Sequence, residues 1–232
     1  MNVNAEFAER VVIHSQTLEW QDSPIKGVKR RMLDRVGAEV ARATSIVSYE
    51  PGSHFSSHVH TGGEEFIVLD GVFQDEHGDF PVGSYIRNPP QSSHTPGSKP
   101  GCVIFVKLWQ FDLEDRTHIR TDMQKAGFVR DAGRQGVSVS TLYSDEREQV
   151  RFETWDPNST ITLDAAKGAE LLVLDGDFTE SREKLETLSW MRLPVGSSFS
   201  AQTGALGAKV WIKTGHLVFA QEEAERLPVT HQ

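Results

Sequence analysis

Two matching stretches decide the fold class. Residues 62–73 read GGEEFIVLDGVF, and residues 167–178 read KGAELLVLDGDF, so the second stretch repeats the first at an offset of 105. Each is a short run rich in Val, Ile, Leu and Phe that ends at Asp-Gly, a pattern typical of a β-strand leading into a turn. The repeat is too long for a solenoid, so it indicates two copies of one β-unit.

The repeat extends outward from these two stretches. SYIRNPP (84–90) aligns with SWMRLPV (189–195) at the same offset, and CVIFVK (102–107) aligns with AKVWIK (208–213) at an offset of 106. Further short apolar runs bounded by Gly, Pro, Asp and Ser follow at intervals of roughly 8–12 residues, and no stretch keeps a helical period over a useful length. We therefore expect an all-β chain built from two tandem barrels.

The domain boundary is expected in the polar stretch EDRTHIRTDMQKAG between the two β-rich regions. The resulting prediction is a first domain over residues 1–115 and a second over residues 116–232. Each half has the size of a typical small domain.

Composition excludes several classes of protein. The 232 residues include 24 Lys and Arg against 33 Asp and Glu, a net charge of −9, with no basic stripe of the kind that binds nucleic acid. No apolar run approaches the roughly 20 residues that span a bilayer, and the N-terminus lacks a signal-peptide pattern. Cys102 is the only cysteine, so no disulfide can form within the chain. We expect a cytoplasmic protein.

The densest chemical feature is PGSHFSSHVHTGGE at residues 51–64. His58 and His60 are two apart, so on a strand both imidazoles face the same side. Glu64 follows a Gly-Gly that lets the chain turn, and His94 comes after a second strand and a Pro-Pro pair. The competing interpretation is a few surface histidines beside a turn. A fourth donor at suitable spacing and the Gly and Pro context favour a metal site.

Three imidazoles and one carboxylate suit a borderline divalent ion. The prediction is one divalent metal ion per chain, with zinc as the first choice and iron, manganese or nickel as alternatives. Four protein ligands leave up to two positions for water or substrate if the metal is octahedral.

The same residues resemble a known family. Gly52-x5-His58-x-His60-x3-Glu64-x6-Gly71 is similar to the first cupin motif, and Gly83-x5-Pro89-x4-His94 resembles the second. Two positions depart from the second motif, because Gln91 replaces Gly and Ser98 replaces Asn. The strings GGEEFIVLDGVFQDEHGDF and YIRNPPQSSH are closest to the ChrR-type cupin family, which includes the zinc-holding C-terminal domain of ChrR anti-sigma factors. They are also similar to small diketone-cleaving cupin dioxygenases.

This resemblance implies tandem cupin (double-stranded β-helix, or jelly-roll) barrels, a bicupin. It covers roughly residues 18–111 well and the second half only in its framework. Carried over position by position, it implies four metal ligands, and they are the four that spacing had already selected: His58, His60, Glu64 and His94.

The internal repeat tests that ligand set. At the offset of 105 the four positions become apolar, namely Leu163, Ala165, Ala169 and Phe199. We therefore expect a degenerate second domain without metal. Glu65 recurs as Glu170, which favours a structural role for Glu65, such as a strand-edge ion pair.

Other candidates have less support. His54 shares the strand parity of His58 and could line the cavity, but it lies outside the motif. Cys102 aligns with Ala208, which favours a small core residue over a redox thiol. No further acid–base pair is evident, so the catalytic residues stay unassigned.

Three functions compete. Family resemblance ranks first a regulatory or sensor protein like the ChrR cupin. A metal-dependent dioxygenase or hydrolase acting on a small oxygenated, diketone-like compound is the alternative, and a protein whose metal holds a ligand or ties the barrel together is the third. Sigma-factor binding is not expected, because only about 20 residues precede the first repeat. The partners considered are a small molecule at the metal and a second copy of the chain.

Overall fold

The computed structural model describes residues 1–38 and 40–228 and divides into two compact units. The first unit contains residues 1–5, 19–125 and the described residues from Glu222 on, and the second contains residues 6–18 and 126–221. The units interleave along the chain, which the sequence analysis did not anticipate. The division into 1–115 and 116–232 stays a prediction.

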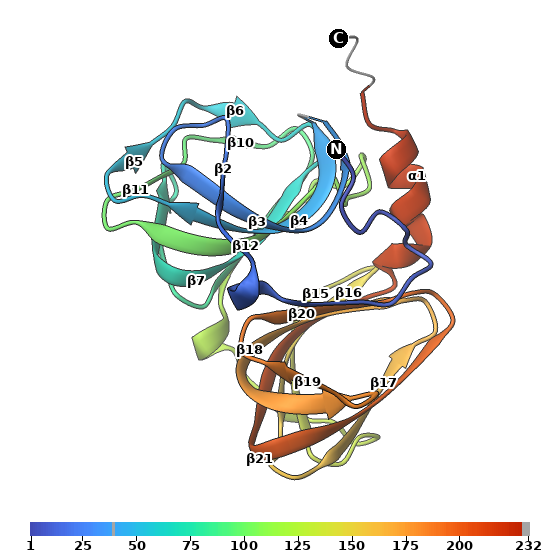
Figure 1. Ribbon diagram of the computed structural model, residues 1–232. Helices are drawn as coiled ribbons and strands as arrows, with labels where there is room; N and C mark the ends of the chain where they lie inside the picture. The colour runs from blue at the N-terminus through green and yellow to red at the C-terminus, as the bar shows by residue number, and fades with distance from the viewer. Residues whose placement is uncertain (39, 229–232) are drawn as a thin grey trace. The chain divides into compact units, whose positions relative to one another are not determined.

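The first unit is built from strands with two short connecting pieces of helix (Figure 1). Its main sheet has the order β13-β9-β7-β12-β4-β3-β2, with β5, β8 and β11 joined to it, and β6 pairs with β10 in a separate two-stranded sheet. The strands are β2 (Gln21–Asp22), β3 (Val28–Gly37), β4 (Ala41–Tyr49), β5 (Ser53–His54), β6 (His58–Val59), β7 (Glu64–Asp75), β8 (Gly78–Pro81), β9 (Ser84–Asn88), β10 (Ser93–His94), β11 (Gly97–Ser98), β12 (Cys102–Leu108) and β13 (Ile119–Asp122). The 3-10 helix η2 (Met123–Lys125) follows β13, and the single α-helix of the described residues, α1 (Ala220–Glu225), lies near the C-terminus.

Alternation along β7 and β12 builds the interior of this unit. Phe66 and Val68 on β7 pack with Ile104 and Val106 on β12 in one buried cluster. Because successive side chains of a strand face opposite sides, Glu64 shares the inward face of Phe66. Cys102 belongs to the same cluster, and burial raises the pKa of its thiol to about 11, as befits a core residue.

The second unit has the same plan. Its sheet has the order β1-β20-β18-β21-β16-β15-β14, with β17 paired to β21 and β19 to β18. The elements are β1 (Val11–His14), η1 (Ser15–Thr17), β14 (Val129–Arg130), β15 (Val137–Ser144), β16 (Gln149–Trp155), β17 (Thr160–Ala165), β18 (Ala169–Glu180), β19 (Glu183–Glu186), β20 (Ser189–Leu193), β21 (Ser197–Thr214) and η3 (His216–Phe219).

These sheets confirm the predicted all-β class, and each unit is a jelly-roll barrel. The second barrel has a large apolar core cluster that includes Phe178 and Phe199. Within the described residues, no helix has the length and hydropathy needed to cross a membrane.

Candidate metal centre

The four predicted ligands come together in the first unit. His58 on β6 lies opposite His94 on β10 in the strand pairing, His60 follows β6, and Glu64 is the first residue of β7. One donor atom from each lies within 4.8 Å of the others. The structure therefore brings together the four side chains that the sequence predicts as ligands, and their binding of a metal stays a prediction.

The donor spacing fits a divalent metal. The His60 Nε2 and His94 Nε2 atoms are 3.2 Å apart, and Glu64 Oε2 lies 3.3 Å from the first and 3.6 Å from the second. Ligand bonds of about 2.1 Å separate neighbouring donors by about 3.0 Å in an octahedron and about 3.4 Å in a tetrahedron. The observed separations match these values, so the residues could hold a metal.

Two side chains orient the imidazoles. The Ser92 hydroxyl lies 3.0 Å from His60 Nδ1, and the Asp75 carboxylate lies 3.3 Å from His94 Nδ1. A carboxylate can only accept there, so the His94 proton is on Nδ1 and its Nε2 carries a lone pair. Such outer partners fix the tautomer and orientation of ligating histidines. Both Nε2 atoms are thus directed at a shared point.

Asp75 is itself held in place. Its Oδ1 accepts the backbone N–H of His77 at 2.7 Å in the β7–β8 hairpin, which leaves Oδ2 for His94. Burial of the Asp75 carboxyl opposes its ionisation, but the hydrogen bonds from His94 and His77 outweigh this and lower its pKa. Asp75 therefore presents a negative charge to His94.

A glycine turn delivers Glu64. Gly63 has φ +79°, in the left-handed region that glycine adopts without strain. A Cβ on Gly62 would overlap the indole of Trp109, and one on Gly63 would collide with the ring of Phe111. Both glycines are thus required for the chain to pass from β6 into β7. Asn88, paired with Glu64 across the sheet, donates its amide to Glu64 Oε2 at 3.3 Å.

The electrostatics keep the carboxylate ionised. Burial opposes ionisation of Glu64, but the hydrogen bond to His60 and the charges of the three histidines hold its pKa at about 2. Burial lowers the pKa of His58 despite the opposing charge of Glu64. For His94, burial is outweighed by the hydrogen bond to Asp75 and by neighbouring carboxylates, so its pKa is raised.

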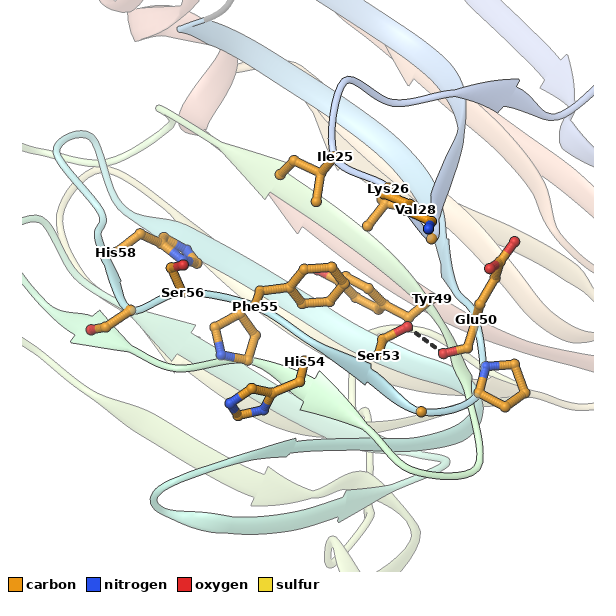
Figure 2. A pocket seen from close by; sticks show the side chains of 15 residues that line it. Ile25, Lys26, Val28, Tyr49, Glu50, Ser53, His54, Phe55, Ser56 and His58 are labelled. Carbon is orange, nitrogen blue, oxygen red and sulfur yellow. Dashed lines mark hydrogen bonds between the residues drawn. The ribbon is translucent and has the colours of Figure 1, made fainter.

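Three of the four donor residues are buried, and the fourth is exposed. Glu64 is 8%, His60 6% and His94 3% exposed, whereas His58 is an exposed residue. His58 also lines a pocket of about 820 Å³ that runs along residues 49–58. Figure 2 shows His58 at one end of this pocket. Of the four donor residues, His58 is the one that lines this pocket.

Tyr49 is a polar group that sequence reasoning missed. It packs on the inner apolar cluster, with its ring centroid 6.0 Å from that of Phe73, whose ring lies 5.7 Å from that of His94. Burial first, and the charge of Glu64 second, raise the pKa of Tyr49 far above its usual range. Its hydroxyl therefore stays protonated.

Two other predicted residues lie outside the cluster. Glu65 faces the opposite side of β7, where it is 1% exposed and accepts a 2.8 Å hydrogen bond from Tyr85. Its role is structural, as expected, but it is buried in the middle of a sheet rather than at a strand edge. His54 is exposed and lines the pocket without joining the donors.

The residues that support the candidate ligands carry no strong sequence signal. Asp75 aligns with Glu180 and Ser92 with Ser197, so the comparison of the two repeats does not distinguish these positions. Asn88 aligns with Leu193, a polar-to-apolar change next to the ligand positions that could have identified it.

The second unit repeats the geometry without the donors. Leu163 lies opposite Phe199, as His58 lies opposite His94, and Ala169 pairs with Leu193, as Glu64 pairs with Asn88. Among the residues that the structure describes, the four ligands of the first unit form the only cluster of this kind.

Comparison with known proteins gives a partial family match. Residues 8–112 match the model of the ChrR cupin-like domain, which is less than half of the chain. A search of curated protein sequences found no match.

Solved structures share the fold at low sequence identity. A "putative dioxygenase" from Nostoc punctiforme is 14% identical with a TM-score of 0.74, over 91% of this chain and 84% of that one. A bacterial pirin from Escherichia coli in complex with nickel(II) is 12% identical with a TM-score of 0.59, over 88% and 98%. A mutant oxalate decarboxylase from Bacillus subtilis is 9% identical with a TM-score of 0.60, over 88% and 76%. At these identities the likeness shows the cupin fold alone.

Proposed function

We propose that this chain is a metal-dependent enzyme of the oxygenase or hydrolase class that acts on a small oxygenated compound. One observation carries the proposal: three of the four candidate ligands are buried, whereas His58 is exposed and lines a pocket of about 820 Å³. A metal that only ties strands together needs no such pocket. Four protein ligands would close a tetrahedral site, so the proposal requires a bound metal that takes five or six ligands and leaves a position for water or substrate.

The chain's own residues prepare the site for a ligand. A divalent metal bound there would supply Lewis acidity towards a carbonyl group or water or, if it is iron, reactivity with dioxygen. Glu64 contributes one negative charge, and Asp75 and Ser92 hold two imidazoles in a fixed orientation. Tyr49 lines the same pocket as His58, so its protonated hydroxyl would donate a hydrogen bond to an oxygen atom of a substrate bound there.

In this proposal the chain is a bicupin that arose by duplication and holds one metal per chain. The matching strand registers of the two units support the duplication. In this proposal the second unit has a structural role, because apolar side chains fill its core. Zinc stays the first choice of metal, and iron, manganese and nickel stay alternatives, because imidazole and carboxylate donors suit all four.

A metal-dependent sensor is the second candidate. The match of residues 8–112 to the ChrR cupin-like domain supports it. A sensor and an enzyme would use the same open site, one to bind a signal molecule and the other to convert a substrate.

Turnover separates the two candidates. Protein loaded separately with zinc, iron(II), manganese or nickel is screened against small esters, lactones and 1,3-dicarbonyl compounds, with oxygen uptake and product formation followed. His58→Ala and Glu65→Gln serve as the site variant and the matched control. The proposal expects turnover in the wild type and Glu65→Gln and none in His58→Ala. Stoichiometric binding with no turnover by any metal form would favour the sensor.

A further inference from the structure

The pocket beside His58 is longer than a small chelating group requires. In Figure 2 His58 lies at one end, Phe55 and Tyr49 occupy the middle, and Lys26 and Glu50 lie at the other end. Its volume of about 820 Å³ falls within the range of roughly 300–1,000 Å³ that holds drug-sized ligands. If a two- or three-carbon compound were bound at the metal, water would fill most of the pocket.

The walls of the pocket are mostly apolar. Phe55 is half-buried and its backbone N–H donates to the Pro96 carbonyl at 3.0 Å, which fixes one wall. Ile25, 56% exposed, and Val28 face it from the segment on the opposite side (Figure 2). Ligand pockets are typically lined by apolar and aromatic side chains, and Ile25, Val28, Tyr49 and Phe55 together give this pocket such a lining.

Two aromatic rings form the floor. The centroids of Tyr49 and Phe55 are 5.1 Å apart with their planes inclined at 49°. Aromatic rings attract a further ring at centroid distances of about 4.5–7 Å in tilted or offset geometry. A planar apolar group entering from the His58 end would meet both rings.

From this geometry we infer the class of ligand: an oxygen chelator that carries an aromatic or similarly bulky apolar group. Its oxygen atoms occupy the open side of the metal centre, and its apolar group lies along Phe55 and Tyr49 toward Ile25. This inference rests on the proposed metal-dependent function and narrows its substrate class. It makes the natural ligand larger than a simple short-chain diketone.

Two hydroxamates test the inference, because both chelate divalent metals through two oxygens and differ in a methyl against a phenyl group. Dissociation constants of acetohydroxamate and benzohydroxamate are measured by calorimetry on the metal-loaded full-length protein. The phenyl ring adds five heavy atoms, which at typical ligand efficiencies corresponds to about tenfold tighter binding. We expect this preference in the wild type.

The variants locate the preference in the pocket. Phe55→Ala and Ile25→Ala should reduce the benzohydroxamate preference several-fold and leave acetohydroxamate binding within twofold. Ile25 is exposed, so its replacement leaves the fold intact even if Phe55→Ala does not fold. Phe128→Ala, a change at a 39% exposed phenylalanine of the second unit, is the matched control and should change neither constant.

The outcomes separate this inference from the proposed function. If both hydroxamates bind with equal affinity, or if Phe55→Ala and Ile25→Ala keep the full phenyl preference, the inference is wrong and the open metal centre stands. If neither hydroxamate binds to metal-loaded protein, the centre has no open position and the proposed function fails with it.

Discussion

His94 lies directly opposite His58 in the pairing of β10 with β6, and their ring centroids are 4.9 Å apart. The equivalent pair in the second unit is Phe199 opposite Leu163. The same backbone register thus holds two imidazoles in one barrel and two apolar side chains in the other. Side-chain identity, rather than barrel geometry, decides which unit can hold a metal.

Asp75 should set the strength of metal binding. Replacing Asp75 with Ala removes the acceptor that orients His94, and outer partners of this kind typically contribute 10- to 100-fold in metal affinity. We expect the dissociation constant, measured by competition with a chromophoric chelator, to rise at least tenfold in Asp75→Ala and less in Asp75→Asn, which keeps an acceptor oxygen. Asp70→Asn, an exposed change on the same strand, is the control. Equal metal affinities of the wild type and Asp75→Ala would show that the hydrogen bond from His94 to Asp75 does not contribute to metal binding.

Substitutions of Glu64 and Glu65 should have different effects on metal occupancy, although the two residues are adjacent in the sequence. Glu64→Gln removes the charged donor of the cluster, so metal occupancy should fall by an order of magnitude or more. Glu65→Gln should retain the metal, because Glu65 faces the other side of β7 and bonds Tyr85. The Glu65→Gln substitution should instead lower the thermal stability of the protein, because a buried hydrogen bond to a charged acceptor contributes about 1.5–3 kcal/mol. The reverse pattern of occupancy would refute the assignment of the carboxylate.

Gln91 should be a strained position next to the site. It has φ +70°, and its backbone N–H donates to the carbonyl of His60 at 2.8 Å. A non-glycine residue in the left-handed region costs about 1–2 kcal/mol. Gln91→Gly should therefore stabilise the protein by about 1 kcal/mol, visible as a rise of a few degrees in the melting temperature. A Gln91→Ala variant, which keeps the strain, should show no such rise, and a loss of stability in Gln91→Gly would count against the argument.

The metal-free protein should respond to pH through His94. Its pKa in the folded chain is raised above the ordinary value of about 6.5, so protonated His94 stabilises the metal-free fold below that pH. This contribution is lost as the pH rises through the folded pKa. Glu64 acts in the opposite sense, since its pKa of about 2 gives stability above about pH 4.5 that disappears only in strong acid.

Thermal unfolding of chelator-treated protein at pH 6 and pH 8 measures the effect. We expect His94→Gln to remove a stabilisation that is larger at pH 6 than at pH 8. The metal-loaded protein should instead be more stable at pH 8 than at pH 6. Protons compete with the metal for imidazole nitrogen, so the ion is released as the pH falls. Identical pH responses of wild type and His94→Gln without metal would contradict this account.

Much of the site could be predicted from the sequence because its signals are local. The two-residue spacing of His58 and His60 and the Gly-Gly before Glu64 specify strand parity and a turn, and both are present in the structure. The internal repeat then distinguished Glu64 from Glu65, which spacing alone does not. The all-β class followed from short apolar runs separated by turns.

Other features depend on contacts between distant segments. Asp75 contacts His94 across 19 positions of sequence, and Tyr49 packs on Phe73, whose ring lies beside that of His94. The assignment of residues 6–18 to the second unit rests on β1 pairing with β20, nearly 180 residues later in the chain. No local pattern encodes such pairings, so the interleaving of the units was not foreseen.

Metal content per chain tests the central claim most directly. Wild-type protein and the variants His94→Ala and Phe199→Ala are analysed by inductively coupled plasma mass spectrometry, after dialysis against the metal that the native protein contains. The account predicts one equivalent in the wild type, less than one tenth of an equivalent in His94→Ala, and one equivalent in Phe199→Ala, whose change lies at the matching position of the second unit. Two equivalents in the wild type, or one equivalent retained in His94→Ala, would contradict it.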